Sequence, residues 1–331
     1  MTNDQERKLL DARNLTRRFA QKGRRETVAA VDDVSFSLPG ERAIILAVAG
    51  ESGSGKSTLA SMLLGFLPPS EGTIAFSGMD VSHLTRTQRA QYRHMVQGIF
   101  QDPFDAFNPF YPVEHALHLA IEKFSLAKNR QEAASLIDKN LRAVRLKPEA
   151  TLGRYPHQLS GGQLQRVMIA RALMIHPRLI IADEPVSMID ASLRAIVLEI
   201  MASLRDEHGI SQVYITHDLS SALQISDQIL VLYRGTVVES GNAAAVIETP
   251  KHPYTQALLA AVPVADPEVE AARPRMIVTG EVPSALNPPP GCRFHTRCPS
   301  AMPVCKTIDP ELTDLSNGRA VACHLHAPVR G

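Results

Sequence analysis

Short, continuous apolar runs recur along the chain, and each run is bounded by glycine, proline or charged residues. AIILAVAG (43–50) is too short for a helix of its own and ends in glycine, which favours a buried parallel strand. RLIIAD (178–183) and SQVYITHD (211–218) share this pattern, and each follows helical sequence. Shorter strands are predicted at 30–38 and 72–78, and a hairpin at 229–241 turning at Arg234–Gly235.

Helical periodicity fills the stretches between these runs. A helix is predicted after the Gly/Ser-rich sequence that follows Gly50, and another from Gln163 to the stop signal Pro177. Residues 82 to about 158 lack strong strand runs and predict a helical insertion. Alternating strands and helices indicate an α/β layered domain with a mainly parallel sheet to about residue 250. QKGRRE (21–26) indicates a loop, residues 262–275 a linker, and the rest a small separate module.

Composition and charge narrow the class of protein. The chain has 331 residues, 44% of them hydrophobic and 21% charged, which suits a soluble globular protein. The net charge of +1 argues against a dedicated nucleic-acid binder. No apolar run reaches membrane-spanning length, and the polar start MTNDQERKLL has no signal-peptide pattern. We therefore expect a cytoplasmic protein.

A phosphate-binding loop is the strongest chemical signal. Gly50-Glu51-Ser52-Gly53-Ser54-Gly55-Lys56-Ser57 matches G-x-x-x-x-G-K-[ST], and Thr58 continues it into the predicted helix. Glycines let successive N–H groups point at phosphate oxygens, and the helix N-terminus adds partial positive charge. Lys56 would meet the β- and γ-phosphates and Ser57 would offer its hydroxyl to Mg²⁺. The loop predicts binding of a nucleoside triphosphate.

Two carboxylates end the predicted strand at 178–183. Asp183 and Glu184 would lie at the carboxyl edge of the sheet, where ligands of such sheets bind. Asp183 would hold Mg²⁺, directly or through water, and Glu184 would polarise the attacking water. The pair predicts triphosphate hydrolysis as well as binding.

The order of five motifs resembles that of the ATP-binding cassette (ABC) ATPases. The phosphate loop is followed by Gln101 in IFQDP, by LSGGQ (159–163), by IIADE (180–184) and by His217 in YITHD. The resemblance implies a P-loop NTPase (RecA-like) ABC nucleotide-binding domain over 9–255, with a helical subdomain at about 93–160. It makes ATP and Mg²⁺ the expected cofactors.

The family resemblance also implies residue roles. Gln101 would sense Mg²⁺ and the water, His217 would hold the γ-phosphate, and Phe19 would lie against adenine. Two cassettes would dock head to tail, so that the signature residues of one contact the nucleotide of the other: Ser160, Gly161, Gly162 and Gln163. The segment PVSMID departs from the family's pattern at Met188 and Ile189 but retains Asp190, so we expect the loop between subunits to work.

Aromatic residues concentrate beside Gln101, in the segment that the family resemblance makes the Q-loop. Five of the sixteen Phe and Tyr residues lie within FQDPFDAFNPFY (100–111): Phe100, Phe104, Phe107, Phe110 and Tyr111. They predict either a local core under the helical insertion or an apolar groove that receives a helix of a membrane subunit.

The C-terminal region resembles that of the ATPases of oligopeptide, dipeptide and nickel importers. The resemblance is carried by HPYTQALLAAVP (252–263), GEVPSALNPPPGCRFHTRCPSAMPVC (280–305) and VACHL (321–325). It implies an extension over 256–331 and an ATP-hydrolysing subunit that powers import of peptides or similar solutes. The expected partners are two membrane-spanning permease subunits, a second and paralogous ATPase, and an extracytoplasmic solute-binding protein. The chain would be peripheral, on the cytoplasmic face of the inner membrane, and the other subunits would choose the substrate.

All four cysteines lie within this extension: Cys292, Cys298, Cys305 and Cys323. In a reducing compartment such a cluster favours a metal site over disulfides. Zinc would take four thiolates tetrahedrally, and a [4Fe–4S] cluster one thiolate per iron. Zinc fingers tend to begin with C-x₂₋₄-C, so the wider spacing favours the cluster, as does the family resemblance. Zinc, free thiols and oxidation products remain alternatives.

Two other functions stay open from the sequence. One is a soluble ABC ATPase acting in translation or DNA repair, although such proteins usually carry two cassettes or a long coiled-coil insertion. The other is an iron- or redox-sensing cassette in which the cysteines act and the nucleotide domain gates an interaction.

Overall fold

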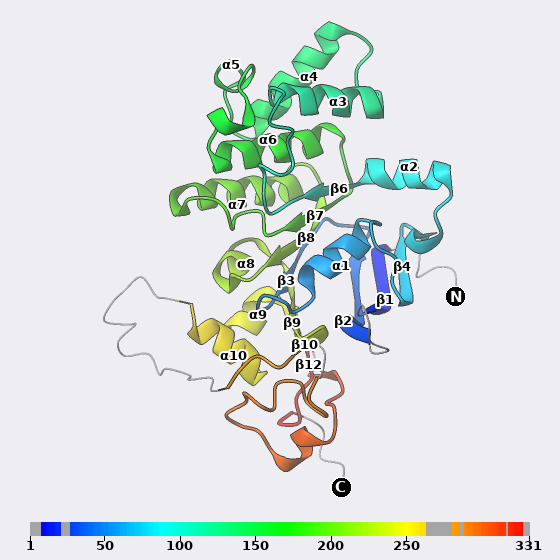
Figure 1. Cartoon of the computed structure of the whole chain (residues 1–331), viewed down its shortest axis with the longest axis vertical. Coiled ribbons are helices and arrows are strands. Elements are labelled where there is room, and N and C mark those ends of the chain that lie inside the picture. Colours follow the sequence, from blue (N-terminus) through cyan, green and yellow to red (C-terminus); the bar gives the residue numbers. More distant parts are fainter. Residues whose placement is uncertain (1–7, 21–26, 263–279, 285–287, 316, 327–331) are drawn as a thin grey trace. The chain divides into compact units, whose positions relative to one another are not determined.

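The chain folds into two compact units in the computed structural model, which describes residues 8–20, 27–262, 280–284, 288–315 and 317–326. The phosphate-loop unit takes residues 1–40, 45–82 and 216–331, and the signature unit takes residues 41–44 and 83–215. Figure 1 shows their elements. The loop predicted at 21–26 and nearly all of the linker predicted at 262–275 lie outside the described residues.

Buried parallel strands support the phosphate loop. All five residues of β3 (Ile45–Ala49) are buried, and β3 pairs in parallel with β9 (Gln228–Tyr233). β10 (Thr236–Asn242) returns antiparallel to β9. The turn between β9 and β10 is at Arg234 and Gly235, as predicted, and both residues have positive φ, at 47° and 89°. Such a two-residue turn matches the twist of the flanking strands.

A second, antiparallel sheet in this unit has the strand order β2-β1-β4-β5. Its strands are β1 (Lys8–Ala20), β2 (Thr27–Pro39), β4 (Glu71–Phe76) and β5 (Met79–Asp80). The sequence predicted parts of β2 and β4 but missed β1. The pairing of β1 with β2 carries several register shifts, and buried residues come in consecutive groups instead of alternating. Because β-bulges break the two-residue period, the pattern of β1 is hard to recognise.

The helices of the phosphate-loop unit are short. They are α1 (Lys56–Leu63), α8 (Leu219–Ile225), α9 (Ala243–Glu248) and α10 (Pro253–Ala260), with 3₁₀ turns at Val81–His83, where the chain passes to the other unit, and at Pro303–Lys306. α1 begins directly at the lysine of the phosphate loop, as the sequence predicted.

Three parallel strands form the sheet of the signature unit: β6 (Val96–Ile99), β7 (Leu179–Asp183) and β8 (Ser211–Thr216). The sequence predicted β7 and β8 but placed β6 inside the helical insertion. With four residues that include a glycine, VQGI has no local strand signal, and its pairing with β7 decides its structure.

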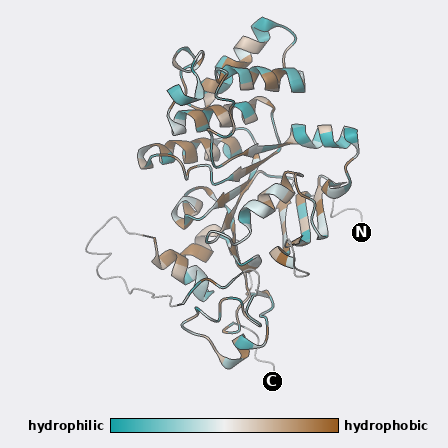
Figure 2. Ribbon diagram, in the orientation of Figure 1, coloured by the Kyte–Doolittle hydropathy of each residue, from teal (hydrophilic) through white to brown (hydrophobic). Residues whose placement is uncertain are grey.

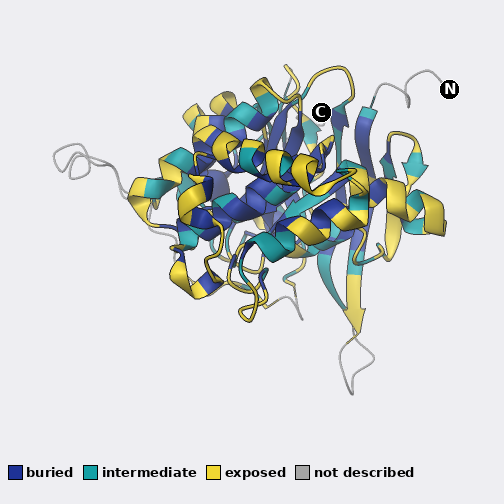
Figure 3. Ribbon diagram, turned by 90° about the horizontal axis from the view of Figure 1, so that it is seen from above, coloured by how far each residue is buried: buried dark blue, intermediate teal, exposed yellow. Residues whose placement is uncertain are grey.

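The helices of the signature unit are α2 (Arg86–Met95), α3 (Glu114–Phe124), α4 (Arg130–Ala143), α5 (Pro148–Thr151), α6 (Gly161–Met174) and α7 (Ala191–Asp206), with a 3₁₀ turn at Pro156–Gln158. Figure 2 shows α2 as mostly hydrophilic, which agrees with its single buried residue, Tyr92. By contrast, ten of the 14 residues of α6 are buried. The burial colours of Figure 3 follow the same division, with buried strands and exposed outer helix faces.

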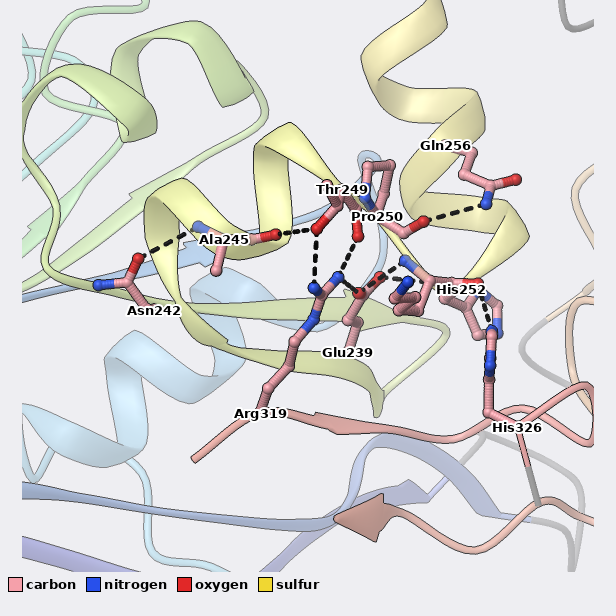
Figure 4. Close-up of polar contacts among 10 residues, drawn as sticks. Glu239, Asn242, Ala245, Thr249, Pro250, His252, Gln256, Arg319 and His326 are labelled. Carbon is pink, nitrogen blue, oxygen red and sulfur yellow. Dashed lines mark hydrogen bonds and ion pairs between the residues drawn. The ribbon is translucent and has the colours of Figure 1, made fainter. Parts of the chain in front are cut away.

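The described C-terminal residues cluster with the phosphate-loop unit, and the separate module that the sequence predicted is not confirmed. β12 (Ala320–Val321) pairs antiparallel with β10 and with β11 (Thr313–Asp314). Glu239 of β10 is fully buried and accepts hydrogen bonds from Arg319 Nη2 at 2.7 Å and from two backbone N–H groups (Figure 4). Arg319 Nη1 also donates to Thr249 Oγ1 at 3.0 Å. Strand pairing and this ion pair attach the described residues 280–284, 288–315 and 317–326, which we call the C-terminal stretch, to the cassette.

Candidate functional site

The phosphate loop connects β3 to α1, and close backbone contacts shape it. A Cβ on Gly55, whose φ is 102°, would lie 2.2 Å from the Ala30 carbonyl oxygen. A Cβ on Gly50 would lie as close to the carbonyl oxygen of Leu232. Only glycine fits these two positions, so the backbone can wrap tightly before the first turn of α1.

Polar groups of the loop converge on its interior. Lys56 is buried, and its Nζ donates to the carbonyl oxygens of Gly50 at 2.7 Å and Glu51 at 2.9 Å. Ser54 Oγ is buried without a hydrogen-bond partner among the described residues. Ser57, at the start of α1, is exposed. A buried ammonium, an unsatisfied hydroxyl and a helix N-terminus together fit a polyphosphate.

Glu51 of the loop is held by residues that the sequence analysis did not assign to the site. Its backbone N–H donates to Tyr254 Oη at 2.7 Å. Its carboxylate accepts two hydrogen bonds from the Arg297 guanidinium, at 2.9 and 3.2 Å. This pairing raises the pKa of Arg297. Arg297 stands among the cysteines in RFHTRCPS, and no local sequence signal connects it with a loop some 245 residues earlier.

The two remaining predicted residues of this unit lie on the surface. Phe19 is on β1 with 39% of its surface exposed, and the Arg17 guanidinium lies 5.0 Å from its ring centroid. An exposed ring can stack on a base. His217 is exposed and lies between β8 and α8.

In the signature unit, the predicted catalytic residues meet at the end of β7. Asp183 is the last residue of the strand and Glu184 follows with a φ of +46°. The Glu184 N–H donates to the Ile215 carbonyl at 2.9 Å. Gln101 Nε2 donates to Glu184 Oε2 at 3.2 Å, across 83 residues of sequence. The structure therefore brings the predicted Q-loop glutamine directly to the predicted base.

The LSGGQ motif forms the start of α6. Ser160 is the N-cap: its Oγ accepts from Gln163 N–H at 3.2 Å, and Gln163 Oε1 accepts from Ser160 N–H at 2.9 Å. This reciprocal capping box explains the serine and the glutamine locally. It also leaves the first N–H groups of a 14-residue helix at an exposed terminus, which is suited to an anion.

The segment that departs from the family pattern packs on the signature glycines. A Cβ on Gly161 would lie 3.1 Å from the Met188 carbonyl oxygen, and one on Gly162 would lie 2.9 Å from Leu193 Cδ1. Ile189 is buried, Met188 is 55% exposed, and Asp190 precedes α7 as its N-cap residue. Met188 therefore departs from the family pattern at an exposed position, whereas Ile189 departs from it at a buried one.

The aromatic segment is partly buried and partly exposed. Phe107 is buried, whereas Phe104, Phe110 and Tyr111 are exposed, Phe110 to 84%. Tyr111 stacks on His115 at a centroid distance of 4.3 Å. An open cavity of about 440 Å³ lies here, walled by Phe107, Tyr111, Leu119, Phe124 and Ile175 among others. An apolar groove thus adjoins the Q-loop segment on the signature unit.

The predicted metal centre is not confirmed. Among the described residues, which include all four cysteines, no group of three or more His, Cys, Asp or Glu side chains is arranged to hold a metal ion. The cysteines are free thiols, and Cys305 is buried. Burial, followed by smaller effects of the three neighbouring thiolates, raises the pKa of Cys292 to about 11.

Comparison with known proteins agrees with both sequence resemblances. Residues 31–187 match the ABC transporter family, and residues 238–305 match the C-terminal region of oligopeptide/dipeptide transporters. The protein YkfD of Bacillus subtilis is 41% identical over 96% of this chain and 95% of its own length. AppF of the same organism, an oligopeptide transport ATP-binding protein, is 42% identical over 91% of this chain and 90% of its own.

Solved structures of nucleotide-binding cassettes share the fold. A dimeric, post-hydrolysis structure of the ATP-binding cassette MJ0796 with ADP and Pi has a TM-score of 0.63 and 27% identity. The match covers 71% of this chain and 98% of that one. CbiO1 from Clostridium perfringens, part of an ABC transporter complex, has the same TM-score at 25% identity, covering 73% of this chain and 91% of its own. Within the part of the chain that the structure describes, no helix is both long and apolar enough to cross a membrane.

Proposed function

We propose that this chain powers the import of peptides or similar small solutes. It belongs to the oligopeptide-type ABC transporter ATP-binding proteins. It is an ABC ATPase with the cassette fold of P-loop NTPases. The observation that carries the proposal is the pairing of the Q-loop with the base, Gln101 with Glu184, in a chain that also has the peptide-transporter C-terminal region. The comparisons give no support to a role in translation or DNA repair, or to an iron- or redox-sensing cassette.

The residues of the two units divide the chemistry between binding and hydrolysis. MgATP, when bound, supplies the phosphoryl group that is transferred to water. Lys56 and the N–H groups at the start of α1 would bind the phosphates, while Ser57 and Asp183 would hold Mg²⁺. The Glu184 carboxylate would accept hydrogen bonds from the attacking water and orient it, with Gln101 keeping that carboxylate in place. His217 would contact the γ-phosphate and Phe19 the adenine.

The signature helix would act on a second cassette. Ser160 is exposed at the N-terminus of α6, where its polar groups are available to a partner's nucleotide, and Gly162 follows in the first turn of the helix, where it is buried. Met188 is exposed in the adjoining segment, where it could meet the partner. Family membership implies a paired ATPase and membrane permease subunits. We propose a paralogous partner, two permeases and an extracytoplasmic solute-binding protein, with this chain at the cytoplasmic face of the membrane.

The groove beside the Q-loop segment would couple the cassette to a permease. Tyr111 lines the groove, and Phe104 and Phe110 of the same segment are also exposed, which is unusual for aromatic side chains on a solvated surface. Because these aromatic residues follow Gln101 closely in the chain, a permease helix bound in the groove would respond to changes in the position of Glu184.

A metal centre at the cysteines remains part of the proposal. What supports it is the proximity of the four thiols: neighbouring cysteines, acting with burial, raise the pKa values of Cys292, Cys298 and Cys323. They do not form a preassembled ligand set, so a [4Fe–4S] cluster or a zinc ion would have to draw them together. Iron, sulfide and zinc analysis of anaerobically purified protein tests this. Colourless protein with one zinc per chain supports zinc, and protein without either metal contradicts both.

The central test is reconstitution. The purified chain should bind MgATP, and the complex with its permease subunits should hydrolyse ATP in response to peptide-loaded binding protein. Lys56→Ala should lose MgATP binding, whereas Arg145→Met, which breaks an exposed ion pair of the signature unit, should not. Absence of magnesium-dependent ATP binding by the wild-type chain would refute the proposed function.

A further inference from the structure

The part of the chain that follows β10 contacts the phosphate loop at Glu51. The Glu51 N–H donates to Tyr254 Oη, its carbonyl oxygen accepts from Lys56 Nζ, and its carboxylate accepts from Arg297. Glu51 is thus fixed on three sides. Two of its three partners, Tyr254 and Arg297, come from the part of the chain that follows β10.

Arg297 is itself held in place with little freedom. Its side chain is only 11% exposed, against 31% for Glu51. Its guanidinium lies 6.0 Å from the ring centroid of Tyr233 and 5.8 Å from that of Phe294. Phe294 is buried, with centroids 5.3 Å from Tyr233 and 5.4 Å from Tyr254. These aromatic rings therefore hold the Arg297 guanidinium where it can donate two hydrogen bonds to the Glu51 carboxylate.

The charge of Glu51 gives this pairing a consequence for nucleotide binding. Glu51 follows the first glycine of a loop whose task is to receive three phosphates. An unpaired carboxylate there would repel them, whereas a paired one adds no net charge. Lys56 donates to the Glu51 carbonyl, so a shift of this residue would also disturb the phosphate-binding lysine.

We infer that Arg297 is a positioning residue for the triphosphate: by pairing with Glu51 it neutralises the loop and holds its shape, so that the C-terminal stretch sets the affinity of the cassette for ATP. This inference rests on the proposed function and gives the C-terminal stretch a part in nucleotide binding. It predicts that the loss of Arg297 harms binding chiefly by exposing the Glu51 charge.

The test is a double-mutant cycle on the full-length chain, with fluorescent MgATP and MgADP as probes. Arg297→Met keeps the apolar stem and removes the charge, so it should weaken MgATP binding about tenfold, or about 1.4 kcal/mol. The loss should be smaller for MgADP, which carries less charge. Glu51→Gln with Arg297→Met should bind MgATP within about threefold of Glu51→Gln alone, because Glu51→Gln has already removed the charge that Arg297 neutralises. In the assembled ATPase, Arg297→Met should raise KM while leaving kcat within about twofold.

The outcomes separate the possibilities. A double variant about tenfold weaker than Glu51→Gln alone would mean that Arg297 only supports the fold, and an Arg297→Met variant that binds like wild type would equally overturn the inference. Should Arg297→Met fail to fold, Arg297→Lys keeps the charge without the fork and should show a partial loss. Arg145→Met is the control for removing an ion-paired arginine. Wild-type protein that binds no MgATP would refute the proposed function itself, before the cycle is measured.

Discussion

Gln101 donates a hydrogen bond from Nε2 to Oε2 of Glu184 at 3.2 Å. The two residues follow neighbouring parallel strands: β6 ends at Ile99, two residues before Gln101, and β7 ends at Asp183, directly before Glu184. Parallel pairing of β6 with β7 brings their carboxyl ends to one edge, which is why residues 83 positions apart meet.

Replacing the base should separate binding from hydrolysis. Glu184→Gln keeps the shape of the side chain but removes the charge that orients water, so ATP turnover should fall at least a hundredfold. MgATP affinity should stay close to that of wild type, because the phosphate loop is untouched. Steady-state hydrolysis together with nucleotide binding checks this. Undiminished turnover would show that Glu184 is not the base.

The phosphate loop should not tolerate a methyl group at Gly55. In Gly55→Ala the Cβ would lie 2.2 Å from the Ala30 carbonyl oxygen, so the loop must move and MgATP binding should be lost. Gly209→Ala is the matched control. Gly209 also has positive φ, at +65°, but nothing lies within 4 Å of its Cβ. That variant should lose only about 1–2 kcal/mol of folding free energy and keep its affinity. Nucleotide titration and chemical unfolding distinguish the two.

The buried ion pair of the C-terminal stretch should matter far more to stability than an exposed one. Arg319→Met leaves Glu239, which is fully buried, with only two backbone donors, and should cost about 3 kcal/mol of unfolding free energy. Arg145→Met breaks a pair whose partners are 55% and 59% exposed, and should cost under about 1 kcal/mol. Urea unfolding of both variants measures the difference. Equal losses would contradict an anchoring role for Arg319.

Stability should fall in mild acid because of one histidine. Burial, with a smaller contribution from the charge of His326, lowers the pKa of His252 from 6.5 to about 3. Between these values the unfolded chain binds a proton that the folded chain does not. The contribution of His252 to the free energy of unfolding is therefore intact above pH 6.5. It is lost as the pH falls toward 3, at up to about 1.4 kcal/mol per pH unit.

His252→Asn tests this origin. His252 Nδ1 accepts the Tyr254 N–H at 3.0 Å at the start of α10, and asparagine can accept the same bond without binding a proton. The free energy of unfolding of this variant should depend less on pH between about 4 and 6.5. An unchanged pH profile would assign the acid sensitivity to other groups.

The sequence alone determined the elements whose patterns are local. The apolar run ending in Gly50, the lysine that opens α1 and the Ser160–Gln163 capping box depend on neighbours a few residues away, so the strand, the phosphate loop and the signature helix could all be predicted. The order of the motifs was sufficient to identify the family, and the comparisons confirmed that identification.

Only the tertiary structure decided what depends on distant partners. β6 exists as a strand because β7 pairs with it, and β1 because β-bulges match it to β2. The C-terminal stretch clusters with the phosphate-loop unit, and Arg297 pairs with Glu51 across 246 residues. Hydrogen bonds and ion pairs between remote segments leave no period in the sequence, since each partner alone is an ordinary polar residue.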